Sequence, residues 1–566
     1  WINLYMNRWQ RSRRHKKKNA LLVPIFFVAR ISFEIEKPPP LPEFLIFMRP
    51  LTIALSLGLV LGGLAERGPI AKAQSADVTN IKDELSPSAF RDYGETSPKK
   101  LKSRIGELTF TKGGFAGGYP SLETIDALKN ELDFHKATQA YIWAVPIVSY
   151  ARWLESHEEL FGAKDGQIVR MTSPKAKQGI LTANATTPYA VAFADLARTG
   201  PLVFDIPKGM SAGVVNDIWQ RGIHDFGMSG PDQGNGAKLL ILAPQMAIPD
   251  GLDTNEYTVI RNGSNIAFLG IRALMPDPAE ADQLLSSFRI FPYAKRANPT
   301  LHPIIDVDES TEWGQWQPHG MAYWQALKKI MDREVFEDRD RFFLSMLASL
   351  GLEKGQPLQP TAAQAEVLKE AAVIGEAMLK SITFDKPFSN DDLYKGTHWD
   401  QLMVVTVDDR DGDMDQLYRR AAFTWEAVSR GKAYYIEQAG IGQQYRTAYK
   451  DGNGNFLEGD KHYKLTMPPN APAEVFWSIV VYDVNSRTLI LNDEGRAALS
   501  SRTGLIENDD GSVTLHFSPE LPVGVEKANW IQTNPDESWF SYLRFYGPTQ
   551  AYFDQTYPLQ DIMPVN

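Results

Sequence analysis

Two apolar runs near the end of the chain carry the strongest hydrophobic pattern. Residues 474–483 are apolar at nearly every position and rich in aromatic and β-branched side chains, which predicts a strand buried on both faces. Residues 538–548 alternate with period two, which places Arg544 on the same face as Tyr542 and Tyr546. We expect this guanidinium to be largely buried among aromatic rings, where it must find hydrogen-bond acceptors.

Helical and strand-like periods alternate in the rest of the chain. Apolar residues recur at helical spacing across residues 125–148, where Pro146 predicts a kink or a break, and again across residues 367–382 after a capping-box start at Thr361. Short β-type runs bounded by Gly, Pro, Asn and Asp follow one another across residues 180–260. The pattern predicts an α+β multidomain chain with two antiparallel β-sandwich domains and helical segments before and between them.

The changes of period also place domain limits. The chain has 566 residues, which is too long for one hydrophobic core. We expect, in chain order, an N-terminal helical segment (residues 74–164), a first β-rich domain (165–300), a helical middle segment (301–435) and a second β-sandwich domain (436–566).

The N-terminal part of the chain carries a different pattern. Residues 1–47 hold a basic arm and a proline run, and we expect them to be an untranslated or non-native leader. Residues 48–73 match a secretory signal peptide, with a charged start, an apolar stretch and small residues at the cleavage positions, so the mature chain would begin at Gln74. A membrane anchor is the alternative, but the apolar stretch is short for one. The sequence predicts a periplasmic or secreted protein with no stable membrane span after cleavage.

Charge and cysteine content narrow the classes of function. The formal net charge is −10, and loss of the basic leader makes the remaining chain more acidic. An acidic protein is a poor nucleic-acid binder, so we expect no nucleic-acid partner. The chain contains no cysteine, which excludes disulfides, thiolate metal sites and a cysteine nucleophile.

Two sets of motifs resemble known domain families. The first set includes residues 181–189 (LTANATTPY) and 230–236 (GPDQGNG) and resembles the domain of unknown function 1254. The second set includes residues 476–478 (FWS) and 543–548 (LRFYGP) and resembles the domain of unknown function 1214. The resemblance implies an exported bacterial protein built from two jelly-roll-like β-sandwich units with helices around them, and it implies no established activity. Thr186 stands where many members of the first family have Asp.

Two motifs suggest catalysis, and each also has a plainer interpretation. Residues 209–213 match the G-x-S-x-G motif that exposes a serine nucleophile, but the β-type surroundings favour an ordinary turn at Ser211. His224 and Asp225 could act as a general base and the carboxylate that orients it, although neighbours on a strand point to opposite faces.

Two acidic loops raise the question of calcium. Residues 408–415 concentrate aspartates, and residues 451–455 resemble the start of an EF-hand loop, but both depart from the full template. The histidines lack the spacing of a zinc site. We predict no metal and no cofactor, with calcium as an unsupported option.

A set of aromatic and polar residues forms the candidate ligand site. Indole, amide and guanidinium groups suit sugars, carboxylates and aromatic small molecules, through stacking and cation–π attraction. They are equally compatible with packing between domains. The members of the set are Asn184, Thr187, Tyr189, Trp477, Asn529, Trp530, Arg544 and Tyr546.

The sequence leaves two hypotheses for the function. One is a hydrolase-type enzyme that acts on a glycan, an ester or another small organic ligand in a cleft between the two β domains, with His224 and Asp225 as its catalytic residues. The alternative is a non-catalytic ligand- or glycan-binding module, or an envelope structural protein. A pocket that holds an ionisable pair would favour the first hypothesis.

Overall fold

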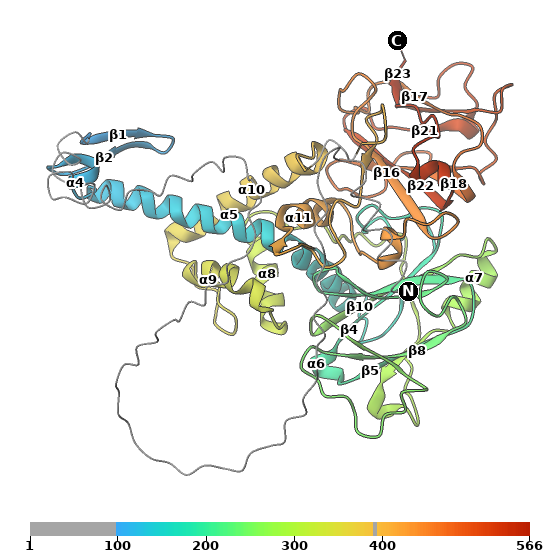
Figure 1. Ribbon diagram of the computed structural model, residues 1–566, viewed down its shortest axis with the longest axis horizontal. Coiled ribbons are helices and arrows are strands. Elements are labelled where there is room, and N and C mark those ends of the chain that lie inside the picture. Colours follow the sequence, from blue (N-terminus) through green and yellow to red (C-terminus); the bar gives the residue numbers. More distant parts are fainter. Residues whose placement is uncertain (1–97, 389–392, 566) are drawn as a thin grey trace, which may run out of the picture. The chain divides into compact units, whose positions relative to one another are not determined.

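The computed structural model describes residues 98–388 and 393–565 (Figure 1). The predicted leader and signal peptide, residues 1–73, lie outside the described residues. The described residues belong to one structural unit. None of their helices is long and apolar enough to span a membrane.

A 34-residue helix, α5 (Leu122–Glu155), is the longest helix of the described residues. The Ser121 hydroxyl caps its start by accepting a hydrogen bond from the Thr124 amide at 3.2 Å. The first half of the helix is largely exposed, whereas most residues from 137 to 154 are buried. Pro146 lies in this buried half and the helix continues through it, so the predicted break is absent. Packing around the proline outweighs the loss of one amide hydrogen bond.

Further helices pack against the buried half of α5 (Figure 1). The rings of Tyr141 on α5 and Tyr323 on α8 stack with their centroids 4.0 Å apart. Thr361 and Gln364 form the predicted capping box at the start of α10. The helical elements of this part are η1 (Ser156–Leu160), α8 (Met321–Arg333), η3 (Asp338–Asp340), α9 (Arg341–Ser349), α10 (Ala362–Phe384), α11 (Leu417–Glu426) and η5 (Lys432–Tyr435).

A first group of strands forms two sheets, with the strand orders β12-β3-β4-β10-β6-β7 and β11-β5-β8-β9. Side chains from both sheets, among them Ala192 of β4, Phe204 of β5 and Leu269 of β10, belong to one hydrophobic cluster. The elements are β3 (Val169–Met171), β4 (Tyr189–Asp195), α6 (Leu196–Thr199), β5 (Leu202–Ile206), β6 (Ser211–Asp217), β7 (Gly222–Gly227), β8 (Ala237–Leu242), β9 (Thr258–Arg261), β10 (Ile266–Ala273), α7 (Pro278–Leu285), β11 (Arg289–Pro292), η2 (Tyr293–Lys295) and β12 (Ile305–Asp306).

A second group of strands forms two more sheets, β13-β16-β22-β18-β19 and β21-β20-β17-β23. The two predicted core strands are confirmed as β18 and β22, which pair in antiparallel fashion with Ser478 opposite Arg544. The elements are β13 (Asp400–Gln401), β16 (Gln443–Ala448), β17 (Tyr463–Met467), β18 (Ala473–Asp483), β19 (Ala498–Ser500), β20 (Val513–Ser518), η6 (Lys527–Asn529), β21 (Trp530–Gln532), β22 (Trp539–Pro548), α12 (Gln550–Phe553) and β23 (Met563–Pro564).

Two small hairpins complete the described elements. One precedes α5, and the other carries the acidic loop. They comprise β1 (Lys100–Ser103), β2 (Gly106–Thr109) and the short helix α4 (Gly114–Gly117), and then β14 (Arg410–Asp411) and β15 (Met414–Asp415).

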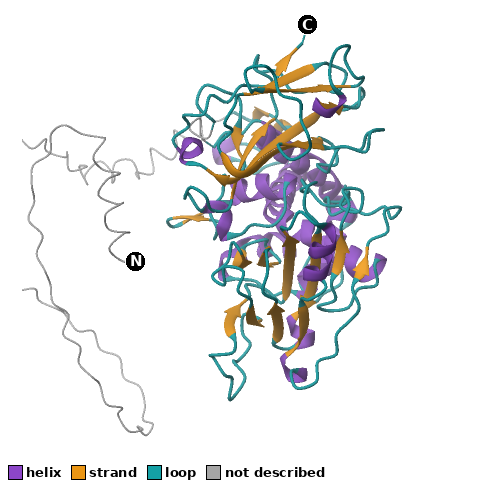
Figure 2. Ribbon diagram, turned by 90° about the vertical axis from the view of Figure 1, so that its right-hand side faces the viewer, coloured by secondary structure: helices purple, strands orange, loops and turns teal. Residues whose placement is uncertain are grey.

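The arrangement is α+β with two sheet-rich regions, as predicted. Figure 2 shows the helices between the two groups of strands. Most strand pairs are antiparallel, but β3 with β12, β8 with β9 and β20 with β21 pair in parallel, so the expectation of purely antiparallel sheets is wrong at these pairs. None of the described sheets closes on itself.

Candidate functional site

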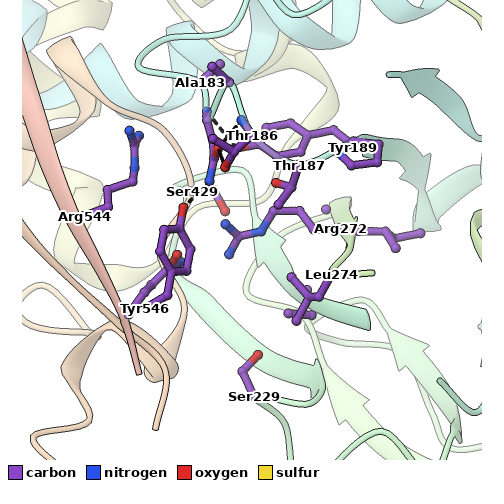
Figure 3. A pocket seen from close by; sticks show the side chains of 18 of the residues that line it. Ala183, Thr186, Thr187, Tyr189, Ser229, Arg272, Leu274, Ser429, Arg544 and Tyr546 are labelled. Carbon is purple, nitrogen blue, oxygen red and sulfur yellow. Dashed lines mark hydrogen bonds between the residues drawn. The ribbon is translucent and has the colours of Figure 1, made fainter. Parts of the chain in front are cut away.

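One large pocket, with a volume of about 1330 Å³, opens between the two sheet-rich regions (Figure 3). Its lining comes from the loop before β4, from β6 and β10, from the segment after α11, and from β16, β18 and β22. This volume exceeds the 300–1000 Å³ that is typical of small-molecule sites. The two regions therefore share one cavity large enough for an organic ligand.

The loop of residues 177–189 forms one wall of the pocket. Lys177 Nζ donates hydrogen bonds to the carbonyl oxygens of Asn184 and Thr187, both at 2.8 Å, and so closes the loop on itself. Thr182 has a φ of 42°, in the left-handed region, and its amide donates to the Arg487 carbonyl at 2.8 Å. The loop belongs to the first sheet-rich region but is held by the second.

Two aromatic residues of the second region also fix this loop. The Tyr482 hydroxyl donates to the Ala183 carbonyl at 2.8 Å, and the side chains of Asn184 and Tyr546 are hydrogen bonded. The Tyr546 ring stacks on Phe476, with centroids 3.9 Å apart. The wall of the pocket is thus held by hydrogen bonds and ring packing rather than by ion pairs.

Arg544 on β22 lies at the buried end of the pocket, and its side chain confirms the prediction of burial with 3% exposure. Its Nη2 donates to the Thr182 carbonyl at 3.1 Å, while its buried Nη1 has no partner among the described residues. Its guanidinium lies 5.4 Å from the ring centroid of Tyr542 and 5.5 Å from that of Tyr445. Burial alone lowers the pKa of Arg544, but the neighbouring tyrosine hydroxyls raise it above its ordinary value. The group stays charged.

A second arginine, Arg272 on β10, enters the same pocket. Figure 3 shows its side chain extending from the strand towards Tyr546. The guanidinium has no hydrogen bond and no ion pair within the described part of the chain. Burial opposes its charge, whereas the nearby tyrosines, led by Tyr434 and Tyr189, raise the pKa of Arg272 above its ordinary value. A partly buried cation without a partner lowers the stability of the folded protein, and a bound anion would offset this cost.

The lining of the pocket holds more positively charged than negatively charged side chains. Two carboxylates line the pocket, and both are engaged: Asp225 accepts hydrogen bonds from the amides of Lys432 and Ala433, at 3.1 and 2.5 Å, and Asp282 pairs with Arg170. The arginines of the lining are Arg272, Arg496, Arg502 and Arg544. The pocket therefore carries an excess of positive charge.

Lys177 adds a cation behind the wall. It is fully buried, and this burial, together with the charges of Arg544 and Arg272, lowers the pKa of Lys177 to about 7. Its charge is coupled electrostatically to both arginines, although its side chain does not line the cavity.

The structure brings part of the predicted ligand set into this pocket. The lining residues of the set are Asn184, Thr187, Tyr189, Arg544 and Tyr546. Trp477, Asn529 and Trp530 do not line it. The Asn529 amide group donates to the carbonyls of Ile506 and Thr514, and the Trp530 indole donates to Ser518, so these residues hold neighbouring backbone in place.

The proposed catalytic pair is divided. Asp225 lines the pocket, but His224 is not among its lining residues, and no hydrogen bond joins the two side chains in the described structure. The reason is the strand: β7 places successive side chains on opposite faces. Burial and the nearby Lys432 lower the pKa of His224, and burial raises the pKa of Asp225. The geometry gives a His224–Asp225 dyad no support.

The remaining motifs lie in structural settings. Ser211 is fully buried at the start of strand β6, and its strand is followed by another strand rather than by the helix that a nucleophile elbow requires. No group of three or more His, Asp or Glu side chains among the described residues converges in a way that could hold a metal ion.

Arg272 and Tyr434 are among the pocket residues that the sequence analysis missed. Arg272 is a cation inside the apolar strand β10, which is the same signal that drew attention to Arg544. Tyr434 lies in a short 3-10 helix at the end of the predicted helical middle segment and has no comparable pattern.

Known structures similar to this chain share little of its sequence. Two solved structures are similar: the VPA0106 protein from Vibrio parahaemolyticus, with 16% identity and a TM-score of 0.48 over 77% of this chain and 100% of that chain, and a putative uncharacterized protein from Burkholderia cenocepacia, with 12% identity and a TM-score of 0.36 over 86% and 98%. No curated protein matches the chain.

Family models match both sheet-rich regions. Residues 166–292 match a protein of unknown function family, DUF1254, and residues 442–550 match a second, DUF1214. These ranges contain the loop and strand of Arg272 on one side of the pocket and the strands of Tyr445 and Arg544 on the other. The chain thus combines a DUF1254 domain with a DUF1214 domain, in that order.

Proposed function

We propose that the protein binds a small organic anion in the pocket between its DUF1254 and DUF1214 domains. The observation that carries the proposal is the pair Arg272 and Arg544, which line one cavity without an ion pair to either in the described structure. A guanidinium removed from water needs an anionic or polar partner, and a carboxylate fits its fork of N–H donors.

The surrounding groups suit recognition of a carboxylate. The hydroxyls of Tyr189, Tyr434 and Tyr546 and the amide of Asn184 lie on the lining and offer neutral hydrogen bonds beside the arginines. Cation–π contacts keep the guanidinium of Arg544 charged and oriented. A bound anion would complete the hydrogen bonding that the protein leaves open at Arg272.

Binding fits the geometry better than hydrolysis does. A hydrolase needs an ionisable pair within hydrogen-bond reach in the pocket. Asp225 is the candidate acid, yet both of its carboxylate oxygens accept backbone amides, and His224 lies outside the lining. Hydrolysis of an ester or a glycan remains the alternative, and a substrate panel run on the purified chain tests it directly.

Titration calorimetry with butanoate and benzoate tests the proposal. We expect saturable binding that Arg272→Gln weakens about tenfold or more, because a charge-assisted pair is lost. Arg289→Gln is the matched control, since Arg289 is exposed and lies outside this pocket. The proposal is refuted if neither carboxylate binds, or if both variants lose the same amount of binding affinity.

We also propose a finer architecture for the two sheet-rich regions and a location for the protein. We infer that each pair of sheets is a jelly-roll-like β-sandwich, with the domain limits given by the sequence, and that the signal peptide at residues 48–73 directs the protein to the periplasm or out of the cell. The shared hydrophobic cluster of the first two sheets supports the sandwich. N-terminal sequencing of protein from the native cell checks the export, with Gln74 expected as the first residue.

A further inference from the structure

We propose that the ligand is an amphiphile, with an anionic head at the arginines and a hydrocarbon chain along the rest of the pocket. This inference rests on the proposed function and specifies the class of anion. It starts from how exposure and polarity are distributed over the lining of the cavity.

Of the four arginines of the lining, Arg544 is buried, Arg272 and Arg496 are partly buried, and Arg502 is exposed. Arg544 is 3% exposed, and its neighbours on the lining, Tyr445 and Tyr542, are buried as well. Arg272 lies beside them and is partly buried. An anionic group that reached these side chains would be largely removed from water.

Part of the lining is both apolar and exposed. Met210, Met228, Ile441 and Val475 all line the pocket, and their exposed fractions are 50%, 49%, 38% and 56%. They come from both domains, so the cavity has a hydrophobic rim where it meets solvent. Large apolar side chains that are exposed on the lining of a cavity suit contact with an apolar ligand.

The lining also includes an apolar and adaptable wall. It includes Leu274, Met275, Leu402 and Met403. Methionine side chains are flexible and polarizable, and they adjust to ligands of irregular shape. A bare carboxylate would leave most of this wall, in a cavity of about 1330 Å³, in contact with water. A hydrocarbon chain attached to the carboxylate would cover it.

The apolar wall favours a hydrocarbon chain over a sugar. Sugar sites place exposed aromatic rings against the ligand, and the two indoles predicted for that role, Trp477 and Trp530, lie outside the lining. Aromatic rings that do line the pocket, among them Phe268, Phe476 and Tyr542, are buried. The rim offers aliphatic and thioether groups instead. The occupant we commit to is therefore a carboxylate with a single alkyl chain.

A chain-length series tests the inference with the whole protein. Dissociation constants are measured by calorimetry for butanoate, octanoate and dodecanoate below their micelle concentrations, with octanol as the uncharged probe. Each methylene buried should tighten binding about fourfold, so octanoate, with four more methylenes, should bind about 250-fold more tightly than butanoate. Octanol should bind at least tenfold more weakly than octanoate, because it lacks the charge.

Rim variants show where the alkyl chain lies. Val475→Asp should weaken dodecanoate binding tenfold or more and change butanoate binding less than twofold. Leu491→Asp is the control, because Leu491 is 63% exposed and does not line the pocket. Circular dichroism confirms that each variant is folded.

The outcomes separate this inference from the proposed function. If the three carboxylates bind equally and still depend on Arg272, the hydrocarbon chain is not recognised and this inference alone is wrong. If octanol binds as tightly as octanoate, the head group is not recognised and the inference is also wrong. If no carboxylate binds, the proposed function fails together with it.

Discussion

Arg544 and Thr182 are hydrogen bonded across 362 residues of sequence, with the Nη2 of one 3.1 Å from the carbonyl oxygen of the other. The bond joins the DUF1214 domain to the DUF1254 domain at the pocket. Tyr482 donates to the adjacent Ala183 carbonyl, so the same loop is held at two successive peptides. The residue proposed to recognise the ligand thus also holds the two domains together.

Replacing Arg544 by lysine separates charge from geometry. Lysine keeps the positive charge and loses the planar fork, so we expect Arg544→Lys to lower the free energy of unfolding by about 2 kcal/mol and to weaken carboxylate binding. Urea denaturation and calorimetry measure the two effects. Arg341→Lys, at an exposed position, is the control and should change neither. A variant as stable and as tight-binding as the parent would contradict both roles of Arg544.

Binding of the anion should be coupled to the protonation of Lys177. Burial and the two arginines lower the pKa of Lys177 to about 7, and a bound anion would raise it again by favouring the charged amine. Affinity should then be highest below pH 7 and fall as the pH rises from 7 to 8.5, by up to about tenfold for one unit of pKa shift.

Calorimetry in buffers of different ionisation enthalpy measures this coupling as proton uptake on binding. In Lys177→Met the uptake should vanish and the affinity should be flat over the same range. The other titratable groups of the lining are the carboxyl of Asp225, whose pKa burial raises, the carboxyl of Asp282, and the tyrosines. Persistence of the pH dependence in Lys177→Met would assign it to one of these groups instead.

His157 should make the protein sensitive to acid. It is buried against Trp153, Phe161 and Phe193, and this burial lowers its pKa to about 4. Between pH 6.5 and 4 the unfolded chain binds a proton that the folded protein does not, so stability falls as the pH falls, by about 3 kcal/mol in total. Below pH 4 the loss is complete, and above pH 6.5 it is absent.

Denaturation curves of His157→Phe at pH 7 and pH 4.5 check this expectation. The variant should lose less stability between these two values than the parent does. His302→Phe, which removes an exposed histidine, should behave as the parent. An equal acid response in all three proteins would show that His157 is not the cause.

The G-x-S-x-G motif should matter for packing and not for chemistry. An added Cβ at Gly213 would lie 2.1 Å from Cζ of Phe226 and 2.3 Å from the Gly270 carbonyl oxygen, so Gly213→Ala should lower the free energy of unfolding by about 2 kcal/mol or more. Ser211→Ala removes a buried hydroxyl that has no partner among the described residues and should cost less than about 1 kcal/mol. Thermal melts and ligand binding of both variants test this, and loss of binding or of any turnover in a folded Ser211→Ala protein would revive the nucleophile.

The sequence predicted the strands that form the site better than it predicted which residues line the pocket. The apolar runs of β18 and β22 and the burial of Arg544 follow from local periodicity, because a cation in an apolar strand must be enclosed by its neighbours. Arg272 carries the same local signal, but its place in the same pocket as Arg544 depends on contacts between two domains. Local periodicity contains no information on such contacts.

Trp530 and Asn529 show the opposite error. Their polar groups suggested a ligand, yet they are satisfied by Ser518, Ile506 and Thr514 within the second domain. A buried polar side chain has to be paired, and the sequence does not show whether its partner is a ligand or the protein's own backbone.

Because both domains contribute to the lining of one pocket, the two domains are constrained to evolve together. Arg272 and the loop of residues 177–189 come from one family domain, while Tyr445 and Arg544 come from the other. A gene that encoded either half alone would encode half a cavity, with an unpaired arginine open to water. We therefore expect the two halves to be inherited as a unit, and a substitution that alters ligand choice in one half to be followed by a compensating substitution in the other.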